Sequence, residues 1–144
     1  MIFTPGIGPL SERPAPVPAV AVVIETSAPI TTGTRRLTTV ADFGYGLRYS
    51  LMQGRNHLMV PKGQYRVALF SQYAWQRVGQ AWIDIDAGHG PITFYYASPY
   101  TIYSVGAAGF EPQKRPGRGA VLAIVGAAVL IPLLLVGIGL LLTR

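Results

Sequence analysis

The chain of 144 residues carries a formal net charge of +6 and contains no cysteine. Disulfides, thiolate metal sites, thiol catalysis and cysteine-linked lipid anchors are therefore excluded. The basic balance favours anionic partners, and we expect membrane lipids rather than nucleic acid, because no RNP-like or KH-like signature accompanies the scattered arginines.

The first 18 residues form an arm rich in proline and glycine. Five prolines interrupt any helix, and the stretch from Pro14 to Pro18 favours an extended polyproline conformation. The arm has no basic segment ahead of an apolar run, so we do not expect a signal peptide. Two interpretations remain open: an unstructured leader, or a strand-like arm that lies on a partner.

Residues 19–105 are predicted to form one β domain. Residues 19–26 form a predicted strand with one strongly buried face of Val20, Val22 and Ile24, and further strands with two distinct faces are predicted at 64–72, 80–86 and 92–97, with glycine or proline turns between these stretches. In residues 64–72 the alternation places Tyr65, Val67 and Leu69 on the core face and Phe70 on the other. Further strands are expected at 37–40 and 100–105, with a turn or edge piece at 27–34. We predict an all-β fold, a small β-sandwich.

Part of this domain resembles a PEGA-type module. The match begins with the turn Pro61–Val67, which has the form Pro-x-Gly-x-Tyr-x-Val, and continues through an aromatic corner at 73–79 and strands at 81–86 and 92–96. The step Tyr96–Pro99 is similar to one in small β domains of actinobacterial membrane proteins. The resemblance implies an immunoglobulin- or PEGA-like sandwich that displays or docks, and it carries over no catalytic residue.

Residues 106–119 are expected to be a basic linker, and residues 120–142 to be a single transmembrane helix. The 23 residues of AVLAIVGAAVLIPLLLVGIGLLL would span roughly 34 Å, enough for a bilayer core of ~30 Å. Lys114, Arg115 and Arg118 precede this helix and are expected to contact lipid head groups, whereas Arg144 alone follows it. The charge bias predicts a tail-anchored, single-pass protein of the inner (plasma) membrane with a cytoplasmic N-terminal domain. The inverted layout is the alternative.

Small residues mark one face of the predicted helix. Gly119, Ala123 and Ala127 recur at four-residue spacing, which lets membrane helices approach closely. Pro132, in the middle of the span, is expected to kink the helix or to mark a packing contact. This face predicts packing against an integral membrane partner or self-association as a homo-oligomer.

The sequence offers little reactive chemistry. Asp84, Asp86 and His89 form its one ligand-like cluster, but strand alternation places both aspartates on a solvent face. Neighbouring carboxylates on one face also do not suit glycosidase chemistry, which needs them across a cleft. We expect neither a metal nor a cofactor, and no enzymatic activity.

Exposed aromatic residues suggest a docking patch. Trp82, Tyr95, Tyr100 and Tyr103 are candidates, because tyrosine and tryptophan suit both bilayer and protein interfaces. Ordinary packing within the sheet is the competing interpretation.

Together these patterns predict a non-catalytic accessory or interaction subunit of a bacterial membrane protein assembly. The alternative is a lipid- or glycan-binding module at the membrane surface.

Overall fold

The computed structural model of the protein describes residues 16–143. Most of the predicted proline-rich arm therefore lies outside the described residues. Residues 16–18 are exposed and precede the first strand, where the Pro18 carbonyl accepts a hydrogen bond from the Lys62 amide at 3.0 Å.

The described chain forms strands followed by one long helix. The elements are β1 (Ala19–Thr26), β2 (Thr31–Thr32), β3 (Arg35–Arg36), β4 (Thr38–Asp42), β5 (Arg48–Leu51), β6 (Gly54–Pro61), β7 (Gln64–Tyr73), β8 (Gln76–Asp86), β9 (Ile92–Ala97), β10 (Ala107–Gly109) and α1 (Arg118–Leu142). The prediction of a β-rich domain followed by one C-terminal apolar helix is confirmed.

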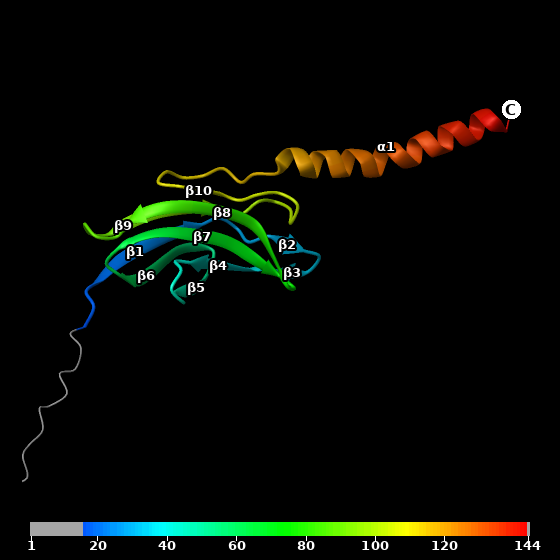
Figure 1. Cartoon of the computed structure of the whole chain (residues 1–144). Coiled ribbons are helices and arrows are strands. Elements are labelled where there is room, and N and C mark those ends of the chain that lie inside the picture. The colour runs from blue at the N-terminus through cyan, green and yellow to red at the C-terminus, as the bar shows by residue number, and fades with distance from the viewer. Residues whose placement is uncertain (1–15, 144) are drawn as a thin grey trace, which may run out of the picture.

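The strands form two four-stranded sheets and a short hairpin (Figure 1). One sheet has the order β10-β9-β1-β6, the other has the order β5-β4-β7-β8, and β2 pairs with β3 alone. Pairing is antiparallel except between β1 and β9, which run parallel. The parallel pair places the end of β9 beside the end of β1, where the chain enters the β2–β3 hairpin.

The two sheets contribute to one apolar core, as the alternation of residue types requires. Inward-facing residues of β1 and β9 in one sheet, and of β7 and β8 in the other, belong to a single buried cluster that includes Val22, Ile24, Val67, Leu69, Ile83, Ile85, Phe94 and Tyr96. The core face predicted for residues 64–72, with Tyr65, Val67 and Leu69, is confirmed. Phe70 lies on the outer side and is nevertheless buried, because the Arg77 guanidinium covers its ring at 4.5 Å.

A β-bulge in β8 ties the two sheets together. The β7–β8 register shifts between Leu69 and Ser71, and Gly79 in the bulge has φ of 62°. Its carbonyl accepts a 2.6 Å hydrogen bond from the buried Tyr96 hydroxyl. A Cβ at Gly79 would lie 2.8 Å from Pro99 Cδ, so the close approach requires glycine here.

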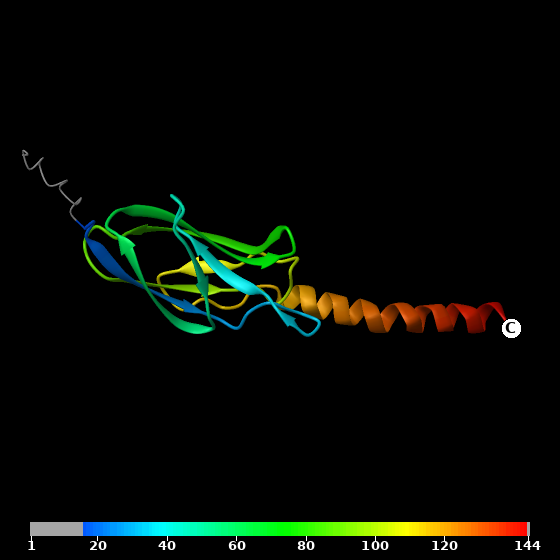
Figure 2. The same cartoon turned by 90° about the horizontal axis from the view of Figure 1, so that it is seen from below.

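The end of the domain from which α1 departs is held by a second apolar cluster of Ile30, Leu37 and Val78, against which Tyr73 and Ile102 pack. This cluster brings together the β2–β3 hairpin, the β7–β8 turn and the loop of residues 98–105. Figures 1 and 2 both show the hairpin at the same end of the domain as the start of α1, with the N-terminal end of β1 at the opposite end. We call this end of the β domain the proximal end.

The boundaries around the predicted linker differ from expectation. Residues 100–105 form turns rather than an edge strand, and the sheet continues in β10 at residues 107–109, inside the predicted linker. The cause is a tertiary contact, because the Gly106 amide donates to the Gln80 carbonyl at 3.1 Å and the chain turns back along β9. The helix starts at Arg118, two residues before the predicted boundary.

Replacing Tyr96 by phenylalanine should destabilise the domain by about 1–3 kcal/mol, because the Gly79 carbonyl would lose its buried partner. Burial raises the pKa of the Tyr96 hydroxyl, so its stabilising contribution is complete below the unfolded-state pKa near 10 and declines as the pH rises above it. Chemical denaturation between pH 7 and pH 11 should show a shallower alkaline decline for Tyr96→Phe than for the parent. Tyr103→Phe, at an exposed position, is the control and should match the parent.

Candidate membrane-proximal site

The C-terminal helix is the most distinctive surface of the molecule. α1 has 25 residues, about 38 Å of helix at 1.5 Å per residue, and none of them is buried. It is long and apolar enough to cross a bilayer. Figure 2 shows it projecting away from the proximal end, so the β domain covers none of its central or C-terminal turns.

Arg115 fastens the chain that leads into this helix to the β domain. Its Nε donates to the Ser98 carbonyl at 3.0 Å, and its Nη2 donates to the Pro99 carbonyl at 3.1 Å. The guanidinium also lies 4.3 Å from the centre of the Tyr100 ring, within cation–π range. In return, the Tyr100 amide donates to the Pro116 carbonyl at 3.1 Å. The segment before the helix is therefore bound to loop 98–105.

The helix begins at a glycine in a left-handed conformation. Gly117 has φ of 92° and forms the N-cap without a side-chain hydrogen bond, and its carbonyl accepts from the Val121 amide. A Cβ at this position would lie 2.7 Å from Ser104 Oγ. Glycine is thus required twice, by its backbone angle and by the close approach of loop 98–105.

The three predicted lipid contacts do not share one environment. Lys114 and Arg118 are exposed, whereas Arg115 is half-buried and donates to backbone carbonyls. Arg118 lines a shallow hollow with Tyr100, Val121 and Leu122, at the first turn of the helix. Of the three, Arg118 is the exposed one that lies within the helix itself.

Sequence reasoning missed Arg36. It belongs to β3, yet it lines a hollow shared with Tyr100 and Arg115, which are distant in the sequence. Tyr100 thus lies between Arg36 on one side and Arg118 on the other. The Arg35-Arg36 pair next to a glycine turn is visible in the sequence, but no local pattern places that hairpin beside Tyr100 and Arg115.

The aromatic residues predicted to form one docking patch are dispersed. Trp82 lies on the outer face of β8 beside Arg66 and Asp84, whereas Tyr95 is half-buried on β9, in the other sheet. Tyr100 and Tyr103 both lie in loop 98–105, at the proximal end. Only these two of the four are close to the helix.

The small-residue face of the helix is unobstructed. Gly119, Ala123 and Ala127 are all exposed, and nothing lies within 4 Å of a Cβ built on Gly119. Pro132 lies inside α1, which continues to Leu142. Because proline has no amide hydrogen, the Ala128 carbonyl lacks its usual helical donor.

The aspartates of β8 are bound to basic groups on the surface. Asp84 accepts from Arg66 Nε at 2.9 Å, and this contact lowers the Asp84 pKa. Asp86 accepts from the Gly88 amide at 2.8 Å, which lowers its pKa, and its other oxygen lies 3.0 Å from His89 Nδ1. Between residues 16 and 143, no group of three or more acidic, histidine or cysteine side chains is arranged to hold a metal ion.

Comparison of the chain with models of protein families, with curated proteins and with solved structures found no match. The site is therefore interpreted from its own geometry.

Replacing Arg115 by glutamine should release the start of the helix from loop 98–105. Loss of two hydrogen bonds from a charged donor should lower the free energy of local opening by about 1–2 kcal/mol. The Tyr100 amide, which bonds to Pro116, should therefore exchange roughly tenfold faster. Hydrogen exchange followed by NMR measures this directly. Lys114→Gln removes the same charge from an exposed neighbour and should leave the Tyr100 amide protected. Equal exchange in both variants would show that Arg115 does not fasten the junction.

Proposed function

We propose that this chain is a non-catalytic β module anchored in a membrane by α1, and that it serves as an accessory or interaction subunit of a membrane protein assembly. The observation that carries the proposal is the fully exposed apolar helix joined to the β domain through Arg115. An apolar helix of this length without a covering surface is stable in lipid but not in water. Confinement to the bilayer surface makes membrane-bound partners the natural ones.

We also infer that the two sheets form a β-sandwich of immunoglobulin or PEGA type. Two four-stranded, mostly antiparallel sheets with one shared core support this interpretation. Loops at the two ends of such a module are free to display binding residues, while the core has only a structural role.

The residues that resemble a PEGA module have structural roles here. Pro61 to Gly63 form the turn between β6 and β7, and the Tyr65 hydroxyl donates to the Pro61 carbonyl at 2.6 Å. Tyr96, which opens the Tyr-x-x-Pro step, reaches the bulge at Gly79. These contacts support a scaffold that displays and docks, in line with the resemblance.

The acidic groups favour a role other than catalysis. A general acid at neutral pH needs a raised carboxyl pKa, usually obtained by burial. Asp84 and Asp86 instead face solvent and have lowered pKa values, because each is hydrogen-bonded as an anion.

We infer that the β domain faces the cytoplasm. Positively charged residues next to a membrane helix favour the cytoplasmic side, and Arg36, Lys114 and Arg118 all belong to the part of the chain on the N-terminal side of the span. Arg36 adds to the flanking charge through the fold rather than through sequence proximity.

Two aspartates in the centre of α1 should abolish membrane insertion. Leu130→Asp with Leu134→Asp should make the free energy of membrane insertion less favourable by about 2.5–3.5 kcal/mol for each charge near the bilayer centre. In a flotation gradient the parent should rise with the membranes, whereas the double variant should stay in the soluble or aggregated fractions. Leu130→Ile with Leu134→Ile is the matched control and should float. A parent that does not float would refute membrane anchoring.

Partner identification requires gentle extraction of the full chain from its native membrane. We expect stoichiometric integral membrane proteins, or a second copy of this chain, to co-purify and to be identified by mass spectrometry. Ala123→Leu with Ala127→Leu places bulky side chains on the small-residue face and should reduce that association at least several-fold. Val125→Leu, at an exposed position outside that four-residue series, is the control and should not reduce it. A chain that always elutes as a lone monomer would contradict the subunit role.

A further inference from the structure

We propose that the proximal end of the β domain is a docking surface for anionic lipid, in which Arg35, Arg36 and Arg118 bind phosphate head groups while Trp75 and Tyr103 enter the bilayer interface. The proposal rests on the membrane anchoring of α1 proposed above. It assigns a membrane contact to loops and a hairpin that lie far from the helix in sequence.

The first support is position. In Figures 1 and 2 the β2–β3 hairpin lies at the end of the domain from which α1 leaves and points toward the same side as the helix. Arg36 and Tyr100 line one hollow, and Tyr100 and Arg118 line the next, so the hairpin and the helix start are joined by shared neighbours. A bilayer that begins near the first turn of α1 would therefore meet the hairpin as well.

The second support is charge. Three carboxylates of the described chain form ion pairs with arginine, in the pairs Asp42–Arg48, Glu25–Arg55 and Asp84–Arg66, and Asp86 is hydrogen-bonded to His89. Within residues 16–143, Arg35, Arg36 and Arg118 have no carboxylate within salt-bridge distance. Arginine pairs well with phosphate, and each basic residue near an anionic surface contributes about 1 kcal/mol of attraction. The proximal end therefore matches an anionic bilayer.

The third support is the exposed aromatic residues at the same end. Trp75, in the β7–β8 turn, is 88% exposed, and Tyr103, in loop 98–105, is 82% exposed. A water-exposed tryptophan at the tip of a turn gains little from the protein, whereas the head-group region of a bilayer suits its amphipathic ring. Met52, in the β5–β6 turn, is 78% exposed and adds a further apolar side chain to the surface.

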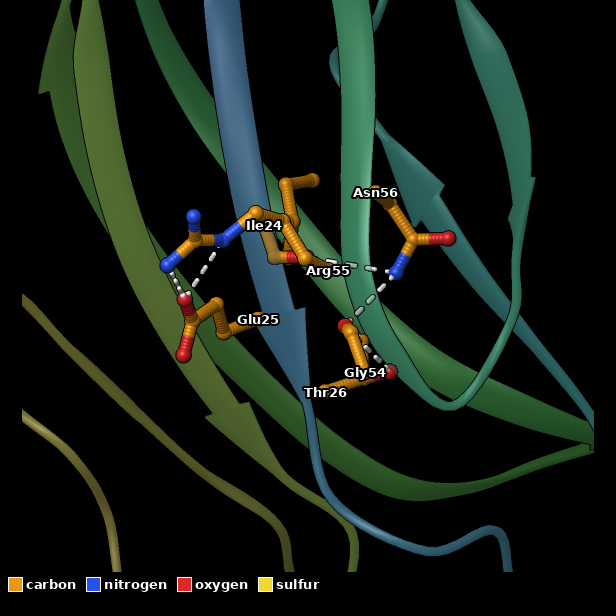
Figure 3. Close-up of polar contacts among 6 residues, drawn as sticks. All are labelled: Ile24, Glu25, Thr26, Gly54, Arg55 and Asn56. Atoms are coloured by element: carbon orange, nitrogen blue, oxygen red, sulfur yellow. Dashed lines mark hydrogen bonds and ion pairs between the residues drawn. The ribbon is translucent and has the colours of Figure 1, made fainter.

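The β5–β6 turn lies next to this end, because Gln53 in the turn lines the hollow shared by Arg36, Tyr100 and Arg115, and polar contacts hold the turn against the end of β1 (Figure 3). The Asn56 side-chain amide donates to the carbonyls of Ile24 and Gly54, at 3.2 and 3.1 Å, and Thr26 bonds to the Met52 carbonyl. Figure 3 also shows Glu25 beside Arg55, so the acidic residue nearest this turn is already neutralised. The carboxylate of Glu25 therefore does not oppose an anionic surface.

A protein partner with an acidic face is the competing occupant. We favour lipid because the arginines and the aromatic residues surround the start of a membrane-spanning helix, where head groups are always present. Lipid contact also predicts dependence on bilayer charge in the purified protein, without any second protein.

The two tryptophans provide a direct test with the full chain in vesicles. Trp82→Phe leaves Trp75 as the sole reporter, and Trp75→Phe leaves Trp82, which is on the outer face of β8. In vesicles with phosphatidylglycerol and a lipid brominated near the head group, we expect Trp75 emission to fall at least twofold and Trp82 emission to be unchanged. Equal quenching of both, or quenching of neither, would overturn the proposal.

The charge dependence is tested in the single-reporter variant that retains Trp75. Arg35→Gln with Arg36→Gln should lower the equilibrium constant for docking by about fivefold for each arginine, so that quenching is largely lost. Quenching should also be largely lost in vesicles of neutral phosphatidylcholine. Arg36→Gln alone should lose part of the quenching, and Lys62→Gln, at an exposed site outside the proximal end, is its single-charge control and should leave quenching unchanged. Quenching that is indifferent to lipid charge and to both arginines would overturn the role of the arginines.

A label gives a second readout that does not depend on tryptophan replacement. The chain has no cysteine, so Thr34→Cys in the hairpin and Gln64→Cys at the start of β7 are each unique. A water-soluble maleimide should react several-fold more slowly at residue 34 than at residue 64 in anionic vesicles, and equally in detergent.

Flotation of the same samples separates the two proposals. A chain that floats while Trp75 is unquenched would overturn the docking surface alone. A chain that fails to float would refute membrane anchoring, and the docking surface with it.

Discussion

The hydrogen bond from the Tyr96 hydroxyl to the Gly79 carbonyl is the contact on which the arrangement of this protein depends. It joins a residue of one sheet to a bulge in the other, in a buried site where neither group has water as an alternative partner. The bulge in turn fixes where loop 98–105 can run, because Pro99 packs on Gly79 and the Gly106 amide bonds to Gln80. A glycine at 79 therefore determines the position of a loop, and that loop receives Arg115 and the start of the helix.

Because of this chain of contacts, the segment between the sheet and the helix is not a free tether. A flexible linker of a dozen residues would let a domain sample many orientations at the membrane. Here the strand β10, the side chain of Arg115 and the close approach of Gly117 to Ser104 restrict the junction. One end of the β domain is consequently directed toward the side on which the helix leaves. Loops at that end are displayed as a group, although they come from four separate parts of the chain.

The elements with a regular pattern were predictable from sequence, because burial of one face imposes a period of two on a strand and an uninterrupted apolar run on a membrane helix. The core faces of β1, β8 and β9 follow this rule. The sequence does not reveal contacts that depend on long-range placement, such as the β1–β9 parallel pair. It predicted a strand at 100–105 because tyrosine and valine favour strands, but tertiary hydrogen bonds turn that segment instead. The same limit hid Arg36, whose neighbours Tyr100 and Arg115 are brought to it only by the fold.

The distribution of charge is more informative than its total. A net charge of +6 on a small protein is compatible with a basic surface spread over every face. Pairing removes that ambiguity, because three arginines are neutralised locally by Asp42, Glu25 and Asp84. Those exposed pairs contribute little to stability. They leave Arg35, Arg36 and Arg118, at the proximal end, among the basic residues of the described chain that have no carboxylate partner. In the docking surface that we propose, the arginines without a carboxylate partner give this end of the domain its preference for an anionic bilayer, and an uncharged or acidic surface there would remove that preference.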